Sequence, residues 1–283
     1  MAAVRFKPDT KRFAGRTHPG RRGGANEDVI GWDEASSFWF VADGMGGHAS
    51  GDVASRVVKE TLLGEALALP LVDAIRKAHE TVAATAKTNT AYDNMGSTVV
   101  ATRIAQRQAE IAWVGDSRAY LWRDGSLSAL TRDHSYLEVL RIQENLTDEQ
   151  LRGHPNRNLV TQTLGIGLPE PSVAKLMLRR RDWLLLCSDG LNDELEDQEI
   201  AEVLRTHREP EKATEALIDA ALAKGGRDNV SAVLVEYDGP NGISFSRAMS
   251  QKLRPLLPMM FSIVGGMAAA TLVAVLWWWF YGR

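Results

Sequence analysis

The order of helical and strand-like segments in this sequence predicts a fold of the α+β class. Apolar residues recur at helical spacing over residues 50–69, and a second helical pattern begins at Pro70. Residues 98–130 then read as a meander of short strands, and further helices precede a last apolar run at 230–235. Strands grouped in a meander, with helices before and after them, are typical of this class.

The first third of the chain contains two expected strands and two expected helices. The strands Val29–Trp32 and Phe38–Ala42 flank a polar turn. The helix at 50–69 follows, and Pro70 begins a second helix that extends to about Thr88.

Three strands, at Thr98–Ile104, Glu110–Val114 and Ala119–Arg123, form the expected meander, and Asp124-Gly125 predicts a hairpin turn into Leu127–Leu130. Residues 131–175 break the pattern because they are polar and rich in proline and glycine, although Leu137–Leu151 favours one or two short helices. The remaining elements are a strand, two helices and a strand, at Trp183–Cys187, Glu199–Thr206, Glu211–Lys224 and Val230–Val235.

Aspartates stand where the buried strands begin or end. Asp43, Asp116 and Asp189 each follow an apolar run, and Asp228 stands just before one. Strand-end carboxylates that meet at one edge repel each other unless cations lie between them. Ligand sets made only of oxygen atoms suit hard ions such as Mg2+ and Mn2+, so the sequence predicts a metal site at this edge.

These acids belong to motifs whose order and spacing form a pattern. The motifs are Asn26-Glu27-Asp28, Asp43-Gly44-Met45-Gly46-Gly47-His48, Met95-Gly96-Ser97-Thr98, Gly115-Asp116-Ser117-Arg118, Ser188-Asp189-Gly190 and Arg227-Asp228-Asn229. In these residues the chain resembles the metal-dependent Ser/Thr protein phosphatases of the type-2C group, most closely their bacterial branch. The resemblance covers about residues 13–237. It implies two antiparallel sheets packed face to face and flanked by helices, with a variable flap at 131–175 beside the metal site.

The resemblance also implies two Mn2+ or Mg2+ ions per domain, which neutralise the phosphate and lower the pKa of a bridging water. Asp43 would bridge the ions and Gly44 would offer its carbonyl oxygen. Asp189 and Asp228 would complete the first ion's protein ligands. Asp28, with Glu27 behind it, would orient waters on the second ion, and Asn229 stands outside the ligand set.

Some family members hold a weaker third ion through acids at the positions of Asp116, Asp189 and Asp193. Asp116 also fits a loop-capping role. The proton donor to the leaving alkoxide has two candidates, His48 and His134, since histidine is the usual donor. His48 could instead cap the helix that follows it.

One position departs from the family pattern. Bacterial members usually carry a phosphate-binding arginine three residues before the Asn of the Asn-Glu-Asp motif, and here that residue is Gly23. We expect Arg22 to replace it, because a guanidinium grips phosphate through two hydrogen bonds.

The C-terminal region changes in character. Residues 239–254 read as a linker with basic residues, and 255–282 contain no charge. Met259–Tyr281 would span about 34 Å as a helix, enough to cross a bilayer. The basic flank before this segment predicts a single-pass C-terminal anchor in the cytoplasmic membrane, with the catalytic domain in the cytoplasm. A core helix or a docked amphipathic helix is the alternative.

Composition limits the other possibilities. The net charge of −3 does not favour a nucleic-acid partner, and the lone Cys187 excludes an internal disulfide. No apolar signal peptide opens the chain. Residues 1–22 are basic and predict either a solvated tail or an arm that faces a substrate. We therefore expect a basic tail at 1–12, a phosphatase domain at 13–238, a linker at 239–254 and an anchor at 255–283.

The expected function is hydrolysis of phosphoserine and phosphothreonine on proteins, in opposition to a Ser/Thr kinase at the membrane. A catalytically weak scaffold that binds phosphoproteins is the alternative, and Gly23 is its support. A phosphatase of small phosphoesters, or one that acts in an anti-sigma-factor switch, is a third possibility, because substrate choice lies in the flap. Turnover that depends on metal separates an enzyme from a scaffold, since a binding module does not need a metal pair.

Overall fold

The computed structural model describes residues 12–46, 50–144, 146–147, 150, 154–156 and 159–239. The predicted anchor at 255–283 and nearly all of the predicted linker lie outside these residues, as does most of the predicted tail at 1–12. Within the described part of the chain, no helix is both long and apolar enough to cross a membrane.

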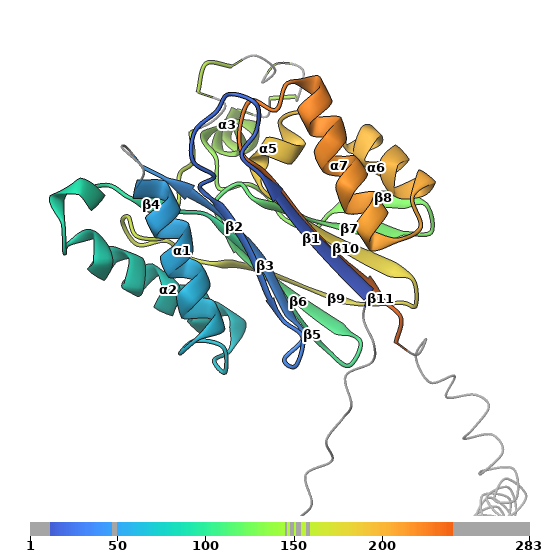
Figure 1. The fold of residues 1–283 in the computed structure, drawn as a ribbon, viewed down its shortest axis with the longest axis horizontal. Helices are drawn as coiled ribbons and strands as arrows, with labels where there is room; N and C mark the ends of the chain where they lie inside the picture. Colours follow the sequence, from blue (N-terminus) through green and yellow to red (C-terminus); the bar gives the residue numbers. More distant parts are fainter. Residues whose placement is uncertain are drawn as a thin grey trace, which may run out of the picture. The chain divides into compact units, whose positions relative to one another are not determined.

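Two antiparallel sheets lie face to face, as the family resemblance implied (Figure 1). The first sheet has the order β1-β11-β10-β7-β8, formed by Arg12–His18, Val230–Tyr237, Asp182–Cys187, Arg118–Arg123 and Ser126–Ala129. The second has the order β2-β3-β5-β6-β9, formed by Asp28–Asp33, Phe38–Met45, Val99–Ala105, Gln108–Val114 and Ser172–Met177. The short strand β4 (Gly96–Ser97) pairs with the end of β3.

The side chains of β3 explain why an unbroken apolar run can form a strand. Phe38 and Phe40 pack with the helices outside the second sheet, whereas Trp39 and Val41 pack between the two sheets. Both faces of the strand are therefore buried, because successive side chains point to opposite sides.

Helices cover the outer face of each sheet (Figure 1). α1 (Ser50–Leu63) and α2 (Leu71–Ala86) lie on the second sheet, and α6 (Asp197–Thr206) and α7 (Pro210–Lys224) lie on the first. The short helices α3 (Tyr136–Glu144) and α5 (Asp189–Asn192) lie at one end of the sandwich, and the 3-10 helix η1 (Thr90–Tyr92) follows α2.

Three elements differ from the sequence prediction. Arg12–His18 form strand β1, which pairs with β11. The prediction of a solvated tail is therefore wrong for these residues. Strand β9 begins at Ser172, inside the segment that we predicted as flap. Helix α1 ends at Leu63 rather than residue 69, because the Gly64 and Ala66 amides both bond back to the Thr61 carbonyl in a tight turn.

Candidate metal centre

Asp28 and Asp43 face each other across two neighbouring strands. Asp28 begins β2 and Asp43 lies near the end of β3, where the two residues are direct partners in the antiparallel register. Directly opposed residues place their side chains on the same face of a sheet. The second sheet therefore presents two carboxylates at one end of the sandwich.

The first sheet supplies Asp189 and Asp228 at the same end. Asp189 begins α5 immediately after β10, and Asp228 precedes β11, the strand that pairs with β10. The two loops touch, since a Cβ atom on Gly190 would lie 2.0 Å from the carbonyl oxygen of Asn229. Glycine at position 190 is what permits this approach.

A serine hydroxyl links the two sheets. Ser188 Oγ donates to Asp28 Oδ2 at 2.7 Å and accepts from the Ser231 amide at 3.0 Å. The carboxylate from the second sheet is thus tied to the strand ends of the first. This contact brings the four predicted acids into one cluster.

Asp116 and Asp193 complete the acidic cluster. Asp116 follows β6 and is buried, and Asp193 ends α5, where its amide bonds to the Asp189 carbonyl at 2.7 Å. Both carboxylates act on Asp189 electrostatically. The structure therefore brings Asp116 and Asp193 near Asp189, and a weaker third ion at these acids stays a prediction.

The pKa values reveal how costly this cluster is without cations. Burial raises the pKa of Asp28 and that of Asp116 to about 6 each. The pKa of Asp43 lies well above its ordinary value, first because the residue is buried and then because Asp28 and Asp189 repel it. Burial and the charges of Asp116 and Asp228 likewise raise the pKa of Asp189 well above its ordinary value.

Two carboxylate oxygens in the cluster have no protein partner. Asp28 Oδ1 and Asp189 Oδ1 are both buried and accept no hydrogen bond. Buried polar atoms are seldom left unpaired, so each marks a place for a further group. Because these carboxylates offer only oxygen atoms, they fit a hard cation such as Mn2+ or Mg2+.

Among the described residues, no three acidic, histidine or cysteine side chains converge on one point closely enough to hold an ion by themselves. Ions that keep several waters need few protein ligands, and Mg2+ behaves in this way. The carboxylates from both sheets act on one another electrostatically, and any ion held among them would have to keep part of its water shell.

Several neutral groups hold the acids in place. The Asp43 amide donates to Thr98 Oγ1 at 3.2 Å, and this hydroxyl shares a hydrogen bond of 2.7 Å with Ser117 Oγ, next to Asp116. Gly44 lies so close to α1 that a Cβ atom would come within 1.9 Å of the Gly51 carbonyl oxygen. The motif around Met95–Thr98 therefore serves to position Asp43.

Asn229 has a larger role than its sequence position suggested. Its Oδ1 accepts from the Glu27 amide at 2.7 Å, and its Nδ2 donates to the carbonyls of Pro19 and Ala25 at 3.1 and 3.4 Å. One side chain thus ties the loop before β2 to the start of β11. An Asn beside a strand-end Asp was the only signal for this role.

Asp52 is a residue that the sequence analysis missed. It lies in the first turn of α1, its charge helps to raise the pKa of Glu27 after the effect of burial, and its Oδ1 is buried without a partner. Glu27 itself stands near Asp228 as well. The acidic cluster therefore extends toward the N-terminus of α1.

The loop that replaces the family arginine has a backbone built for glycine. Gly23 and Gly24 have φ angles of +75° and +125°, which L side chains rarely adopt. The Arg21 amide bonds to the Gly226 carbonyl at 2.7 Å, which fixes this loop beside Asp228, and both Arg21 and Arg22 are exposed. An arginine at position 23 would strain the loop, so the neighbouring arginines are the available guanidinium groups.

The two histidine candidates differ in what can be said of them. His48 lies outside the described residues. His134 Nδ1 accepts from the Gly115 amide at 3.2 Å, so the ring proton lies on Nε2, which bonds to Ser172 Oγ at 2.9 Å. Burial also lowers the pKa of His134. This geometry favours a structural role for His134 over proton donation to a leaving group.

Comparison with known proteins agrees with this geometry. Residues 24–230 match the family model described as protein phosphatase 2C. The chain is 36% identical over 239 residues to the serine/threonine protein phosphatase PstP of Mycobacterium tuberculosis, which covers 80% of this chain and 46% of that protein. It is 36% identical over 238 residues to the serine/threonine phosphatase stp of Listeria monocytogenes, covering 79% of this chain and 94% of that protein.

One solved structure of a relative contains metal ions. The catalytic domain of PstP in complex with two manganese ions superimposes with a TM-score of 0.72 at 33% identity, covering 80% of this chain and 97% of that domain. This chain thus spans about half of the full mycobacterial relative but nearly all of its catalytic domain.

Proposed function

The chain belongs to the protein phosphatase 2C family, and we propose that it hydrolyses phosphoserine and phosphothreonine on proteins. The observation that carries this proposal is the meeting of buried carboxylates from both sheets, two of which keep an unpaired oxygen. A scaffold that only binds phosphoproteins has no need of such a costly cluster.

The acids of both sheets would hold two Mn2+ or Mg2+ ions, as the manganese complex of the relative supports. Asp43 would be the ligand that the two ions share, and Gly44 would offer its backbone carbonyl. Asp189 and Asp228 would complete the ligands of the first, and Asp28 would orient water on the second. Bound ions of this kind neutralise phosphate and lower the pKa of a bound water toward neutrality.

The protein itself supplies a fixed frame for the reaction. Ser188 and Thr98 hold Asp28 and the Asp43 backbone, so these groups need little reorganisation when the phosphate arrives. Asp116 and Asp193 would support a weaker third ion. His48 remains the proposed donor of a proton to the leaving alkoxide.

Arg22 is the proposed contact to the substrate phosphate. Its loop is fixed beside Asp228, and its exposed guanidinium can form two hydrogen bonds to a phosphate. The Arg22→Ala variant should raise the Michaelis constant for a phosphothreonine peptide about tenfold, a loss typical of a charged hydrogen bond. Arg21→Ala serves as the matched control, because the Arg21 loop contact runs through its backbone amide. An unchanged Michaelis constant in Arg22→Ala would eliminate this role.

We also propose that the phosphatase opposes a Ser/Thr kinase at the cytoplasmic membrane. The support is the uncharged segment 255–282 after a basic flank, which predicts a single-pass anchor with the catalytic domain in the cytoplasm. Anchoring would raise the local concentration of membrane-bound substrates. Fractionation of cells that express the full chain or residues 1–239 tests this, since only the full chain should sediment with membranes.

The central test is hydrolysis of a phosphothreonine peptide by the purified protein, with Mn2+, with EDTA, and with Asp43→Asn as control. Turnover that needs Mn2+ and is lost in the variant supports the proposal. If the folded, metal-loaded protein binds the peptide without turning it over, the scaffold alternative replaces it.

A further inference from the structure

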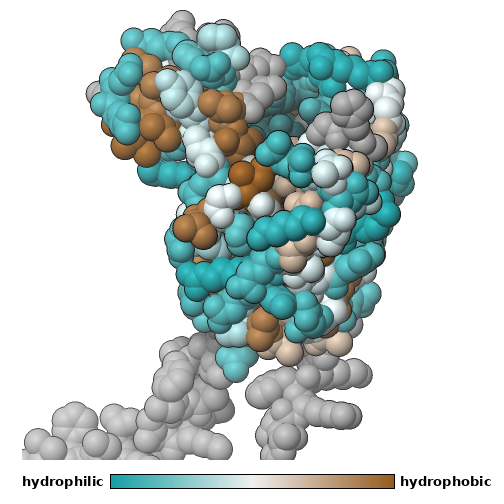
Figure 2. Space-filling model, turned by 90° about the vertical axis from the view of Figure 1, so that its left-hand side faces the viewer, coloured by the Kyte–Doolittle hydropathy of each residue, from teal (hydrophilic) through white to brown (hydrophobic). Residues whose placement is uncertain are grey.

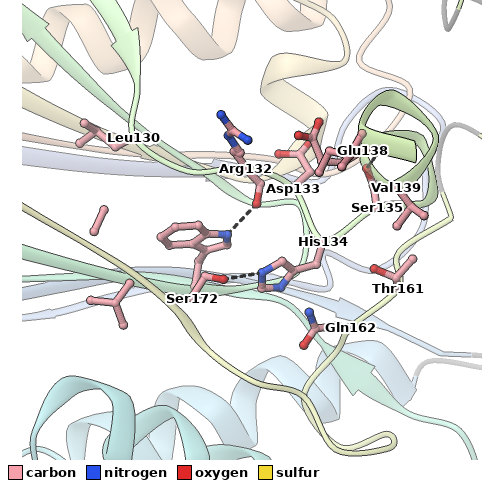
Figure 3. A pocket seen from close by; sticks show the side chains of 14 residues that line it. Leu130, Arg132, Asp133, His134, Ser135, Glu138, Val139, Thr161, Gln162 and Ser172 are labelled. Carbon is pink, nitrogen blue, oxygen red and sulfur yellow. Dashed lines mark hydrogen bonds between the residues drawn. The ribbon is translucent and has the colours of Figure 1, made fainter. Parts of the chain in front are cut away.

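A pocket of about 480 Å³ lies between the segment after β8, helix α3 and the edge strand β9 of the second sheet (Figure 3). This volume falls within the range of small-ligand clefts, which is about 300–1,000 Å³. Residues from five places form it: strand β6, the segment after β8, helix α3, the segment at Thr161 and Gln162, and strand β9. No residue assigned to the metal centre lines it.

The walls are largely apolar and their rim faces solvent. Trp113 forms one wall and donates its indole N–H to the Arg132 carbonyl at 2.8 Å. Ile142 on α3 and Val173 on β9 also line the pocket, with 66% and 41% of their surfaces exposed. Figure 2 shows apolar residues gathered on the projecting upper part of one face and beside the hollow under it. Large exposed apolar side chains around a hollow are typical of an interaction site.

Hydrogen bonds through Gly115 connect the pocket to the residue next to Asp116. His134 lines the pocket, and its backbone amide donates to the Gly115 carbonyl at 2.9 Å, while the Gly115 amide donates to its ring. Asp116 directly follows Gly115. Trp113 also lines the pocket and stands three residues before Asp116, so the pocket lies close to the metal centre on the scale of an extended peptide, which advances about 3.3 Å per residue.

Strand β9 favours an extended peptide as the occupant. It is the outermost strand of its sheet, so its outer N–H and C=O groups have no neighbouring strand among the described residues. Such an edge can bind a further strand through main-chain hydrogen bonds, while side-chain pockets give specificity. Val173 lies on this strand and lines the pocket.

The charged residues around the pocket indicate which peptide sequences it prefers. Asp133 and Glu138 line the pocket, but each is held in an ion pair, with Arg118 and Arg141. The side chain of Arg132 is exposed and bonds to no group in the described part of the chain. The available charge at this opening is therefore positive.

We propose that this pocket binds a large apolar side chain of the phosphoprotein substrate, a few residues from the phosphorylated residue, with an acidic neighbour that contacts Arg132. This inference rests on the proposed phosphatase function. The metal centre recognises the phosphate, and the pocket selects among phosphoproteins.

The test is a positional scan with phosphothreonine peptides. Each peptide is built on alanine and carries one leucine, placed in turn from six residues before to six residues after the phosphothreonine. The full-length chain, purified in detergent with Mn2+, should hydrolyse peptides with leucine at one or two positions about tenfold more efficiently in kcat/KM, mainly through KM. Filling an apolar pocket with a side chain typically has an effect of this size.

Two variants on β9 form a matched pair. Val173→Asp should abolish the leucine preference, because it places a charge at the rim of the pocket. Met177→Asp should keep the preference, since Met177 is similarly exposed on the same strand but does not line the pocket. Neither should change the hydrolysis of p-nitrophenyl phosphate, which is too small to reach the pocket.

A second scan tests the charge. Glutamate next to the preferred leucine should improve kcat/KM by about twofold to fivefold, as exposed ion pairs do, and Arg132→Ala should lose this gain.

Three results would overturn the inference. A flat leucine scan, or a leucine preference that survives in Val173→Asp, removes the pocket from recognition while leaving the phosphatase function intact. If neither p-nitrophenyl phosphate nor any peptide is hydrolysed with Mn2+, the proposed function fails and this inference fails with it.

Discussion

Replacing Asp28 by asparagine should stabilise the metal-free protein even as it removes a carboxylate from the proposed metal centre. Burial raises the pKa of Asp28 from an ordinary value of 3.8 to about 6. One pKa unit corresponds to about 1.36 kcal/mol, so ionised Asp28 costs the folded state about 3 kcal/mol. Asparagine carries no charge, can still accept from Ser188 Oγ and can donate to the neighbouring Asp43.

The sign of this effect fixes its pH window. Below pH 3.8 the carboxyl is protonated in both states and costs nothing. Between pH 3.8 and about 6 the unfolded chain releases the proton while the folded chain keeps it, so wild-type stability falls relative to the variant as pH rises. Above about pH 6 the full difference of about 3 kcal/mol is present.

Urea denaturation in EDTA, at pH values from 4 to 8, measures the difference between wild type and Asp28→Asn. Burial lowers the pKa values of His79 and His134, which opposes the trend in each protein but cancels in the difference. Asp33→Asn is a control of opposite sign, because hydrogen bonds from the Ser36 hydroxyl and amide lower the Asp33 pKa.

Mn2+ should reverse the order of stability, since the wild type should gain more from binding the ion than a variant that lacks this carboxylate. If metal-free Asp28→Asn is no more stable than the wild type at pH 7, burial and repulsion do not dominate at this site. The free-energy cost that we assign to the buried carboxylates would then be wrong.

Three further variants test the frame of the site. Asn229→Ala removes the bonds to Glu27, Pro19 and Ala25, and should weaken Mn2+ binding by about 10–100-fold in calorimetry; an unchanged affinity would contradict the organising role of Asn229. Gly190→Ala places a Cβ atom 2.0 Å from the Asn229 carbonyl oxygen, so the free energy of unfolding should fall by about 1–3 kcal/mol or more in urea denaturation. His134→Gln should lower stability yet leave the pH dependence of kcat unchanged, whereas loss of one limb of the pH profile would make His134 a proton donor after all.

The elements that sequence analysis missed have one cause in common. β1 is an edge strand with three exposed residues among its seven, so its polar sequence resembles a tail until β11 is known to lie beside it. β9 alternates between half-buried and exposed positions and follows Pro169 and Pro171. Because of these prolines, the sequence analysis assigned the start of β9 to the flap. Edge strands are stabilised by a partner distant in sequence, and a local pattern cannot indicate that partner.

The acids of the metal centre were easier to predict from the sequence than the contacts that hold them in place. Acids at strand ends are visible in the sequence, because a buried apolar run before an aspartate already implies a shared edge. The register that sets Asp28 against Asp43 depends on strand pairing, and the link from Ser188 to Asp28 spans 160 positions. Such contacts follow from the packing of two sheets, which no single motif encodes.

The choice of neutral groups for the frame has a chemical reason. A lysine or arginine inserted among the acids would relieve their repulsion, but it would also occupy the oxygens that a cation needs. Hydroxyls and amides bond the acids or their backbone without cancelling their charge, as Ser188, Thr98 and Asn229 do. Asp28 Oδ1 and Asp189 Oδ1 consequently stay unpaired in a site whose shape is already set. The folded protein thus bears the cost of a charged cluster, and binding of a cation recovers that free energy.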